Sequence, residues 1–222
     1  MNGKSEGVVY VLDDDAHVRQ GLDSLLQSVG LQVETFASVK EFLACERPDV
    51  AGCLVLDIRM PGLSGLEFQN ELVKLNIDIP IIFITGHGDI PMTVQAMKAG
   101  AIEFLTKPIR EQDLLHAVRI ALDRDRVRRI KAEAITNMRA RFESLTSRER
   151  DVVAWVTTGK MNKQVAAEIG ISEVAVKVHR HNAMKKLGAK SLAELVRMAD
   201  AVGIGHRSDA SGEGHNSVRS DF

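Results

Sequence analysis

Short apolar runs alternate with amphipathic stretches over the first half of the chain. The apolar runs lie at Val8–Leu12, Leu31–Phe36, Cys53–Leu56, Ile79–Ile84 and Ile102–Leu105, and only the second alternates with polar residues. Runs of this length are typical of strands that are buried in a parallel sheet. A stretch with apolar residues at helical spacing follows each run. This order predicts an α/β domain with an open, doubly wound, five-stranded parallel sheet and right-handed crossovers.

The middle of the chain predicts one long helix. No Pro or Gly interrupts residues 111–143, and apolar residues recur there at mostly helical spacing. We expect the last helix of the α/β domain to continue into a helical linker over residues 124–143. The apolar seam of this linker is narrow and irregular, so the pattern is consistent both with pairing to a second chain and with a solvated single helix.

A small all-α domain is predicted over residues 144–204. Thr146 and Glu149 have the spacing of a capping box. Gly159 and Gly170 end the first two helices, and Ser172 caps the third. A helix, a tight turn with glycine and then a longer helix form the pattern of a helix-turn-helix.

The longer helix, over residues 173–187, has the charges of a DNA-reading helix. We expect its packing face to consist of Val174, Val178, Ala183 and Leu187. Five basic side chains then remain outside: Lys177, Arg180, His181, Lys185 and Lys186. Such a helix fits the major groove of DNA, with cations for the phosphates. A helical bundle with a solvated basic face and no nucleic-acid partner has the same pattern.

The charges are segregated between the two halves of the chain. The formal net charge is only −1. Acidic side chains nevertheless outnumber basic ones over residues 1–123, and basic ones outnumber acidic ones over residues 124–205. A length of 222 residues accommodates two domains. A polyanion is the expected partner of the basic half, unless the segregation is a chance pattern of solvated faces.

Composition narrows the classes of protein that the chain can represent. With 45% hydrophobic residues, there is enough apolar material for a core in each domain. Cys45 and Cys53 lack the spacing of metal ligands and are too few for a disulfide scaffold. The sequence shows no signal peptide and no apolar run of membrane-spanning length. We therefore expect a cytoplasmic protein with no membrane partner, and a flexible tail over residues 205–222.

Polar side chains follow four of the five predicted strands where each strand ends. They are Asp13, Asp14, Asp57, Thr85 and Lys107. In an open parallel sheet, ligands bind at the carboxyl ends of the strands, near the point where the strand order reverses. Three carboxylates in one place repel one another. A lysine or a hard divalent cation relieves this repulsion, and carboxylate oxygens suit Mg²⁺.

This set of residues has the composition of a phosphoryl-transfer site. A carboxylate beside Mg²⁺ and a lysine acts as a nucleophile toward phosphorus, because the cations neutralise charge on the transferring group. A hydroxyl such as that of Thr85 would donate a hydrogen bond to a phosphoryl oxygen. The simpler alternative is that acidic strand ends cap the following helices, which fits Asp15.

These motifs resemble the receiver domain of two-component response regulators. The resemblance is carried by Asp13-Asp14, by DIRMPG at residues 57–62, by Thr85-Gly86 and by Lys107-Pro108. It covers residues 7–123 and implies a flavodoxin-like fold. It also implies that Asp57 is the phosphoacceptor, with a sensor histidine kinase as the source of the phosphoryl group.

The same resemblance implies a magnesium site. Asp14, Asp57 and the backbone carbonyl of Arg59 would bind Mg²⁺ directly, whereas Asp13 would act largely through water. Lys107 would bind a phosphoryl oxygen. Its peptide bond to the following proline would be cis.

A switch pair is implied at two further positions. Thr85 would move toward the phosphoryl group, and the ring of Phe104 would turn inward. Phe104 stands where many receivers have a tyrosine, so no hydroxyl is available there. An ordinary core phenylalanine on a buried strand is the simpler interpretation of the same residue.

The second half resembles the LuxR-type output domain of NarL/FixJ-type response regulators. LTSRE at residues 145–149, NKQVA at residues 162–166 and VKVHR at residues 176–180 carry this resemblance. It implies double-stranded DNA as a partner. Base contacts are implied for Lys177, Val178 and His181, and phosphate contacts for Lys163, His179, Arg180 and Lys185.

The combined prediction is a transcription factor of a two-component system, and not an enzyme. Mg²⁺-dependent phosphorylation of Asp57 would switch DNA binding and dimerisation, with a homodimer as the phosphorylated form. The alternative is a metal-dependent phosphohydrolase with an aspartate nucleophile after the first strand, because Asp13 and Asp15 have the required spacing. A third possibility is a receiver that acts through protein contacts without DNA. The sequence has no inserted cap segment to shield a substrate, which favours the transcription factor over the phosphohydrolase.

Overall fold

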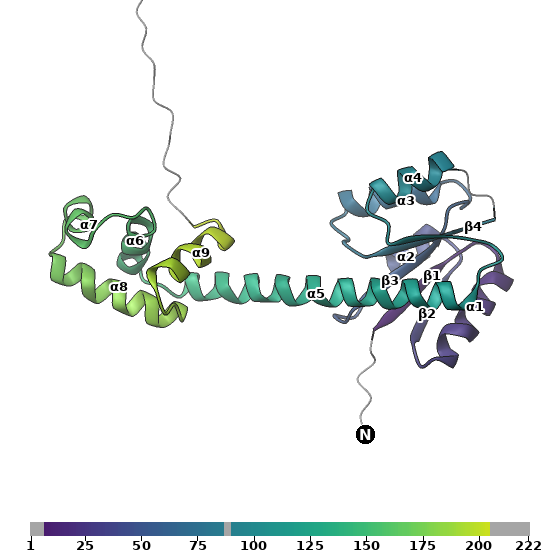
Figure 1. Ribbon diagram of the computed structural model, residues 1–222, viewed down its shortest axis with the longest axis horizontal. Coiled ribbons are helices and arrows are strands. Elements are labelled where there is room, and N and C mark those ends of the chain that lie inside the picture. Colours follow the sequence, from purple (N-terminus) through teal and green to yellow (C-terminus); the bar gives the residue numbers. More distant parts are fainter. Residues whose placement is uncertain (1–6, 87–89, 205–222) are drawn as a thin grey trace, which may run out of the picture. The chain divides into compact units, whose positions relative to one another are not determined.

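The chain folds into two compact units. The computed structural model describes residues 7–86 and 90–204, and the chain divides into Met1–Lys131 and Ala132–Phe222 (Figure 1). The tail that the sequence predicts to be flexible, residues 205–222, lies outside the described residues.

The first unit has the alternating order that the sequence predicts. Its strands are β1 (Val8–Leu12), β2 (Gln32–Phe36), β3 (Gly52–Asp57), β4 (Ile81–Thr85) and β5 (Glu103–Thr106). Its shorter helices are α1 (Ala16–Ser28), α2 (Val39–Ala44), α3 (Gly65–Lys74) and α4 (Ile90–Lys98). The long helix α5 (Glu111–Glu143) follows.

The five strands form one parallel sheet in the order β2-β1-β3-β4-β5. The strand order reverses between β1 and β3, which are hydrogen-bonded neighbours with Leu12 opposite Leu56. The residues that follow Leu12 and Leu56 therefore meet at the carboxyl edge of the sheet, at its switch point. The predicted doubly wound fold is confirmed.

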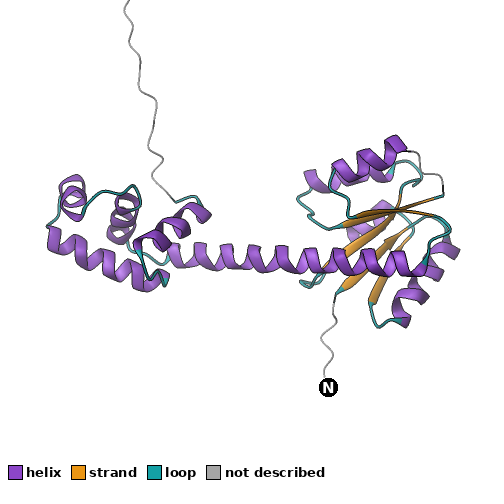
Figure 2. Cartoon of the chain, in the orientation of Figure 1, coloured by secondary structure: helices purple, strands orange, loops and turns teal. Residues whose placement is uncertain are grey.

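Helices cover both faces of the sheet (Figure 2). Helices α2, α3 and α4 contribute Phe42, Phe68 and Ala96 to one core cluster, and α1 and α5 contribute Leu26 and Leu114 to the other. Strands β1, β3 and β4 are buried along their whole length. Burial on both faces explains why these strands appear in the sequence as continuous apolar runs.

Helix α5 is continuous over 33 residues, as its lack of Pro and Gly predicts. Its first turns bury Leu114, Val118 and Leu122 in the first unit. Near its other end, Phe142 is 1% exposed and belongs to the core of the second unit. The segment predicted as a linker, residues 124–143, therefore includes a residue that helps to build the second core.

The second unit consists of the end of α5 and four shorter helices in its described part. These are α6 (Ser147–Val156), α7 (Asn162–Ile169), α8 (Glu173–Leu187) and α9 (Leu192–Val202). The predicted capping box is present, because Thr146 Oγ1 accepts from the N–H of Glu149 and Glu149 Oε2 accepts from the N–H of Thr146. Gly170 ends α7 with φ 67°, a left-handed conformation that glycine adopts without strain.

The packing face of α8 differs from the predicted one. Val176, Ala183 and Leu187 are buried, whereas Val174 is 70% and Val178 is 52% exposed. Residues two positions apart in a helix point in directions that differ by about 200°. Because Val176 is buried, Val174 and Val178 therefore face outward. The prediction that Val174 and Val178 pack inside is wrong.

Candidate functional site

The sheet brings three carboxylates together at its carboxyl edge. Asp13 follows β1, Asp57 ends β3, and one ligand oxygen from each of Asp13, Asp14 and Asp57 lies within 4.8 Å of the others. Asp13 is fully buried and Asp57 is 6% exposed, whereas Asp14 is exposed. A set of hard oxygen donors, one of them open to solvent, is the composition that Mg²⁺ prefers.

Lys107, the residue that follows β5, places its ammonium group between two of these carboxylates. Its Nζ lies 2.7 Å from Oδ2 of Asp13 and 2.7 Å from Oδ2 of Asp57. Burial lowers the pKa of Lys107, but its hydrogen bonds to the two carboxylates outweigh this, so the pKa is raised above its usual value. Burial raises the pKa of Asp13 even though Lys107 donates to it. The ammonium group therefore stays charged between two carboxylates.

The loops around the cluster fix its carboxylates. The backbone N–H of Arg59 donates to Oδ1 of Asp57 over 3.0 Å, and the N–H of Asp15 donates to Oδ1 of Asp13 over 2.9 Å. Asp15 itself caps α1, as expected, by accepting from the N–H of His17. Arg19 donates to the backbone oxygen of Asp13 over 2.6 Å. Sequence reasoning missed Arg19, because no motif signals its contact.

Helix α3 starts against the end of β3. A Cβ atom on Gly65 would lie 2.8 Å from the backbone oxygen of Asp57 and 2.9 Å from Cα of Ile58. The N–H of Gly65 also donates to the oxygen of Ile58 over 2.8 Å. Only glycine allows this approach without displacement of the backbone next to Asp57.

Thr85 and Phe104 lie on the same face of the sheet. Phe83 is opposite Phe104 in the register of β4 and β5, and Thr85 is two residues beyond Phe83. Thr85 is fully buried, and Phe104 is partly buried against the core cluster that includes Phe83. The N–H of Lys107 donates to the backbone oxygen of Thr85 over 2.7 Å, and the Lys107-Pro108 bond is cis as expected.

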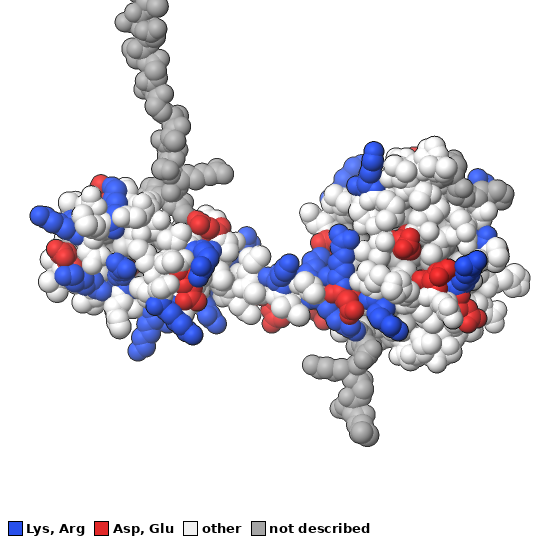
Figure 3. Space-filling view, in the orientation of Figure 1, with Lys and Arg blue, Asp and Glu red and all other residues white. Residues whose placement is uncertain are grey.

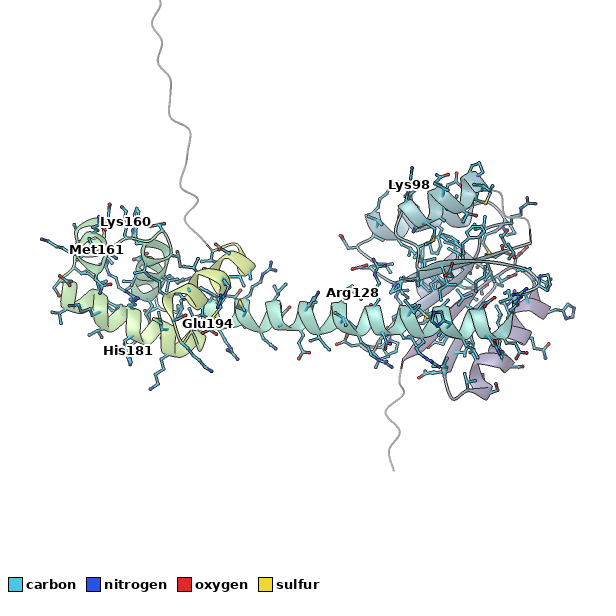
Figure 4. All side chains as sticks on the ribbon, in the orientation of Figure 1. Lys98, Arg128, Lys160, Met161, His181 and Glu194 are labelled. Atoms are coloured by element: carbon cyan, nitrogen blue, oxygen red, sulfur yellow. The ribbon has the colours of Figure 1, made fainter. Side chains whose placement is uncertain are left out.

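A second group of predicted residues lies on α7 and α8 in the other unit. Those with exposed side chains are Lys163, Lys177, Val178, His181 and Lys185, and those partly buried are His179 and Arg180. Figure 3 shows Lys and Arg side chains gathered along α8, and Figure 4 shows His181 on the side of α8 turned away from α6 and α7. The exposed members form a basic face of the kind that contacts DNA phosphates.

Two contacts orient cations on this face. Arg180 Nη1 donates to Oδ1 of Asn162 over 3.3 Å, which links α8 to the start of α7. Lys177 Nζ lies 3.1 Å from Oε1 of Glu173, one turn earlier on α8. The N-terminal turn of α8 is fixed by Ser172, whose Oγ accepts from the N–H of Ala175 over 3.1 Å.

Family models match both units. The response regulator receiver domain matches residues 9–119. The luxR family of bacterial regulatory proteins matches residues 143–199. A receiver domain followed by a DNA-binding domain defines a two-component response regulator that controls transcription.

Relatives match this chain over most of its length. The chain is 54% identical over 200 residues to nodulation protein W of Bradyrhizobium diazoefficiens, covering 90% of this chain and 88% of the relative. It is 43% identical over 198 residues to the transcriptional regulatory protein FixJ of Rhizobium meliloti, covering 89% of this chain and 97% of FixJ. The solved structure of the response regulator StyR matches with a TM-score of 0.76 at 54% identity, covering 87% of this chain and 98% of StyR. The chain belongs to the NarL/FixJ-type response regulators.

Within residues 7–86 and 90–204, no helix combines the length and the apolar character needed to cross a membrane.

Proposed function

We propose that Asp57 accepts a phosphoryl group from a sensor histidine kinase, and that this modification switches DNA binding by the second unit. The observation that carries the proposal is the position of Lys107, whose Nζ lies 2.7 Å from a carboxylate oxygen of both Asp13 and Asp57. A fixed cation next to a carboxylate stabilises the charge that develops on a transferring phosphoryl group.

Accessibility supports Asp57 as the nucleophile in preference to Asp13. The Asp13 side chain is 0% exposed, and its two oxygens accept from the N–H of Asp15 and from Lys107. The Asp57 side chain is 9% exposed, at the same cluster. Both carboxylates accept one hydrogen bond on each oxygen, so burial is what distinguishes them. A phosphohydrolase that used Asp13 would need a fully buried nucleophile, and Asp15 is engaged as the cap of α1.

Mg²⁺ is the proposed cofactor. Asp14 and Asp57, with the backbone carbonyl of Arg59, would hold the ion directly, and Asp13 would act through water. The carboxylate cluster within 4.8 Å supports this assignment. When bound, the ion supplies positive charge to the oxygens of the transferring phosphoryl group.

The proposed transfer forms one bond and breaks one. A carboxylate oxygen of Asp57 attacks phosphorus, and the phosphorus–nitrogen bond of a kinase phosphohistidine breaks, with its electron pair returning to the imidazole. The product is an acyl phosphate on Asp57. Lys107 would hold one phosphoryl oxygen. In the structure, the N–H of Arg59 donates to Oδ1 of Asp57 over 3.0 Å.

The acyl phosphate would bias a two-state receiver. Thr85 would donate to a phosphoryl oxygen, and Phe104 would turn inward on the same face of the sheet. A shift from 1:99 to 99:1 requires about 5.5 kcal/mol of differential stabilisation. Several charge-assisted hydrogen bonds to one phosphoryl group, each worth about 1.5–3 kcal/mol, supply a free energy of this size.

The regulated activity would be DNA binding by a homodimer of a cytoplasmic transcription factor, and not an enzymatic turnover. The receiver would span residues 7–123, the linker 124–143 and the DNA-binding domain 144–204. Lys177, Val178 and His181 would face base edges. The phosphates would be contacted by Lys163, His179, Arg180 and Lys185. The exposure of five of these seven side chains supports this assignment.

The test is a small-molecule phosphodonor with Mg²⁺, followed by intact mass. The wild-type chain and Asp13→Asn are compared with Asp57→Asn. Loss of the added phosphoryl mass in Asp57→Asn alone supports the proposal, and loss in Asp13→Asn alone favours the hydrolase. Salt-dependent gel shifts with Lys177→Ala, with Lys98→Ala on α4 as the control, separate a DNA-binding regulator from one that acts only through protein contacts.

A further inference from the structure

An apolar pair stands on the charged face of α8. Val174 is 70% exposed and Val178 is 52% exposed. Their spacing of four residues places the two side chains next to each other on the helix surface. Neither is needed for the core of the unit, because Val176, Ala183 and Leu187 form the buried face of α8.

The position of Val174 along α8 is as informative as its exposure. Helix α8 begins at Glu173, so Val174 lies in its first turn. In a helix-turn-helix, the N-terminal residues of the second helix contact base edges in the major groove. Its neighbours on the same turn are fixed, because Ser172 caps the helix and Glu173 pairs with Lys177 over 3.1 Å.

We propose that Val174 is a specificity-determining residue that, with Val178, recognises the C5-methyl group of thymine. The thymine methyl is the apolar group that bases present in the major groove, and apolar side chains contact it. A branched valine has few rotamers to lose on contact. This inference rests on the proposed DNA binding and deepens it by assigning a base to one turn of the helix.

Charge complementarity identifies DNA as the occupant of this face. The exposed cations Lys177 and Lys185 lie on the same helix as the valine pair, and Lys163 is exposed on α7. A protein partner for an apolar pair would not require these exposed cations, whereas a duplex places phosphates on both sides of the groove that α8 would enter. A contact with another surface of this chain, or with a second copy, is the competing occupant.

The experiment removes the C5-methyl group from thymine in the DNA and, separately, the methyl groups of Val174 from the protein. Duplexes that bind the phosphorylated full-length chain are selected from a random library. In a selected duplex each thymine is then replaced, one at a time, by deoxyuridine, which lacks only the C5-methyl. Dissociation constants are measured for the wild type, Val174→Ala and Val174→Thr. The control is Val73→Ala on α3, the same substitution at a site that is 71% exposed.

The expected wild-type result is a loss of about four-fold in affinity at one or two thymine positions, the effect of one methyl group leaving an apolar contact. Val174→Ala should bind the parent duplex less tightly and become insensitive to deoxyuridine at one of these positions. Val174→Thr keeps one methyl and should keep part of that sensitivity. Val73→Ala should behave as the wild type.

The inference is overturned if Val174→Ala has the same deoxyuridine profile as the wild type. It is also overturned if Val174→Ala raises the DNA affinity of the unphosphorylated chain and leaves the profile unchanged, because the pair would then cover a contact within the protein. If the phosphorylated wild type selects no sequence at all, the proposed DNA binding fails first and the inference falls with it.

Discussion

The carboxylate of Asp125 on α5 accepts a hydrogen bond from the backbone N–H of Gly52 over 2.9 Å. Gly52 is the first residue of β3, and Asp57 is the last residue of the same strand. Asp125 is 1% exposed, and both of its oxygens also accept from arginines: Arg128 on Oδ1 and Arg129 on Oδ2 (Figure 4 labels Arg128). A buried ionic group therefore attaches α5 to the strand that carries Asp57.

Replacing Asp125 by Asn should destabilise the first unit by about 1.5–3 kcal/mol, because the charge-assisted hydrogen bonds from Arg128 and Arg129 to a buried carboxylate are lost. The penalty is no larger because each arginine is about a third exposed and keeps a second carboxylate partner. The control is Asp123→Asn, two residues earlier, where a 60% exposed carboxylate pairs with Arg126. That pair should contribute at most about 1 kcal/mol. Urea unfolding followed by far-ultraviolet circular dichroism measures both variants.

The single tryptophan, Trp155 on α6, reports on the second unit. Its fluorescence transition should stay unchanged in Asp125→Asn while the circular dichroism transition moves to lower urea. Equal shifts for Asp125→Asn and Asp123→Asn would show that the buried group does not hold α5 to the sheet.

Local patterns were sufficient to predict the strands and the acidic cluster. Val8–Leu12 and Cys53–Leu56 are continuous apolar runs because burial on both faces removes the need for polar residues, and Asp13 and Asp57 interrupt that pattern where the strands end. The switch-point rule then brings the two carboxylates together. The link from Lys107 to both carboxylates follows from the same rule.

Long-range contacts and the facing of α8 could not be obtained in this way. Asp125 looks like one more charge in an arginine-rich helix, and nothing local indicates a partner 73 residues away. On α8, valines at 174, 176 and 178 offer two opposite packing faces. The choice between these faces depends on how α6 and α7 pack against α8, which the sequence of α8 alone does not contain.

Glu149 should make the stability of the second unit depend on pH. Its Oε2 lies 2.6 Å from Nζ of Lys186 and accepts from the N–H of Thr146 over 2.8 Å. The hydrogen bond from Lys186, followed by those of Thr146, holds the pKa of Glu149 below its usual value of about 4.5. The contribution is therefore fully present above the unfolded pKa and is lost as pH falls through the lower folded pKa.

The test is Glu149→Gln, which keeps a capping acceptor for Thr146 but loses the charge. The variant should be less stable than the wild type by about 1 kcal/mol at pH 7, and the difference should disappear under strongly acid conditions. Urea unfolding monitored by Trp155 fluorescence measures it. Glu194→Gln in α9, at a carboxylate that accepts from the N–H of Lys190 just before the helix, is the capping control. A difference that stays constant with pH would refute the contribution of Lys186.

Removing Lys107 should make the first unit dependent on a divalent cation. In Lys107→Ala, the buried Asp13 and the neighbouring Asp57 lose their shared counter-charge, so the unfolding free energy in EDTA should fall by about 3 kcal/mol. Excess Mg²⁺ should stabilise this variant more than it stabilises the wild type, because cation binding replaces the missing charge and shifts unfolding by mass action. Urea unfolding with Mg²⁺ and with EDTA measures the difference.

Lys98→Ala, at an exposed position at the end of α4, is the control for this experiment and should respond to Mg²⁺ as the wild type does. An identical Mg²⁺ response in Lys107→Ala and Lys98→Ala would refute the prediction that a bound cation replaces the charge of Lys107 at the three carboxylates.

Gly65 and Gly21 form a matched pair of glycines in helices with opposite expectations. A Cβ on Gly65 would lie 2.8 Å from the backbone oxygen of Asp57, whereas nothing lies within 4 Å of a Cβ on Gly21 in α1. Gly65→Ala should cost about 1–3 kcal/mol, because α3 or the end of β3 must move. Gly21→Ala should stabilise the chain by about 0.5–1 kcal/mol, because alanine is the better helix former.

The two substitutions also separate stability from phosphorylation. The atoms that the new Cβ in Gly65→Ala would meet belong to the backbone of Asp57 and Ile58. If the end of β3 moves, the rate of phosphoryl transfer from a small-molecule donor should fall, even at temperatures where the variant is fully folded. Gly21→Ala should be phosphorylated at the wild-type rate. Intact mass over time gives the rate, and circular dichroism gives the folded fraction. A Gly65→Ala chain that is destabilised but phosphorylated at the wild-type rate would show that α3 moves and that Asp57 keeps its position.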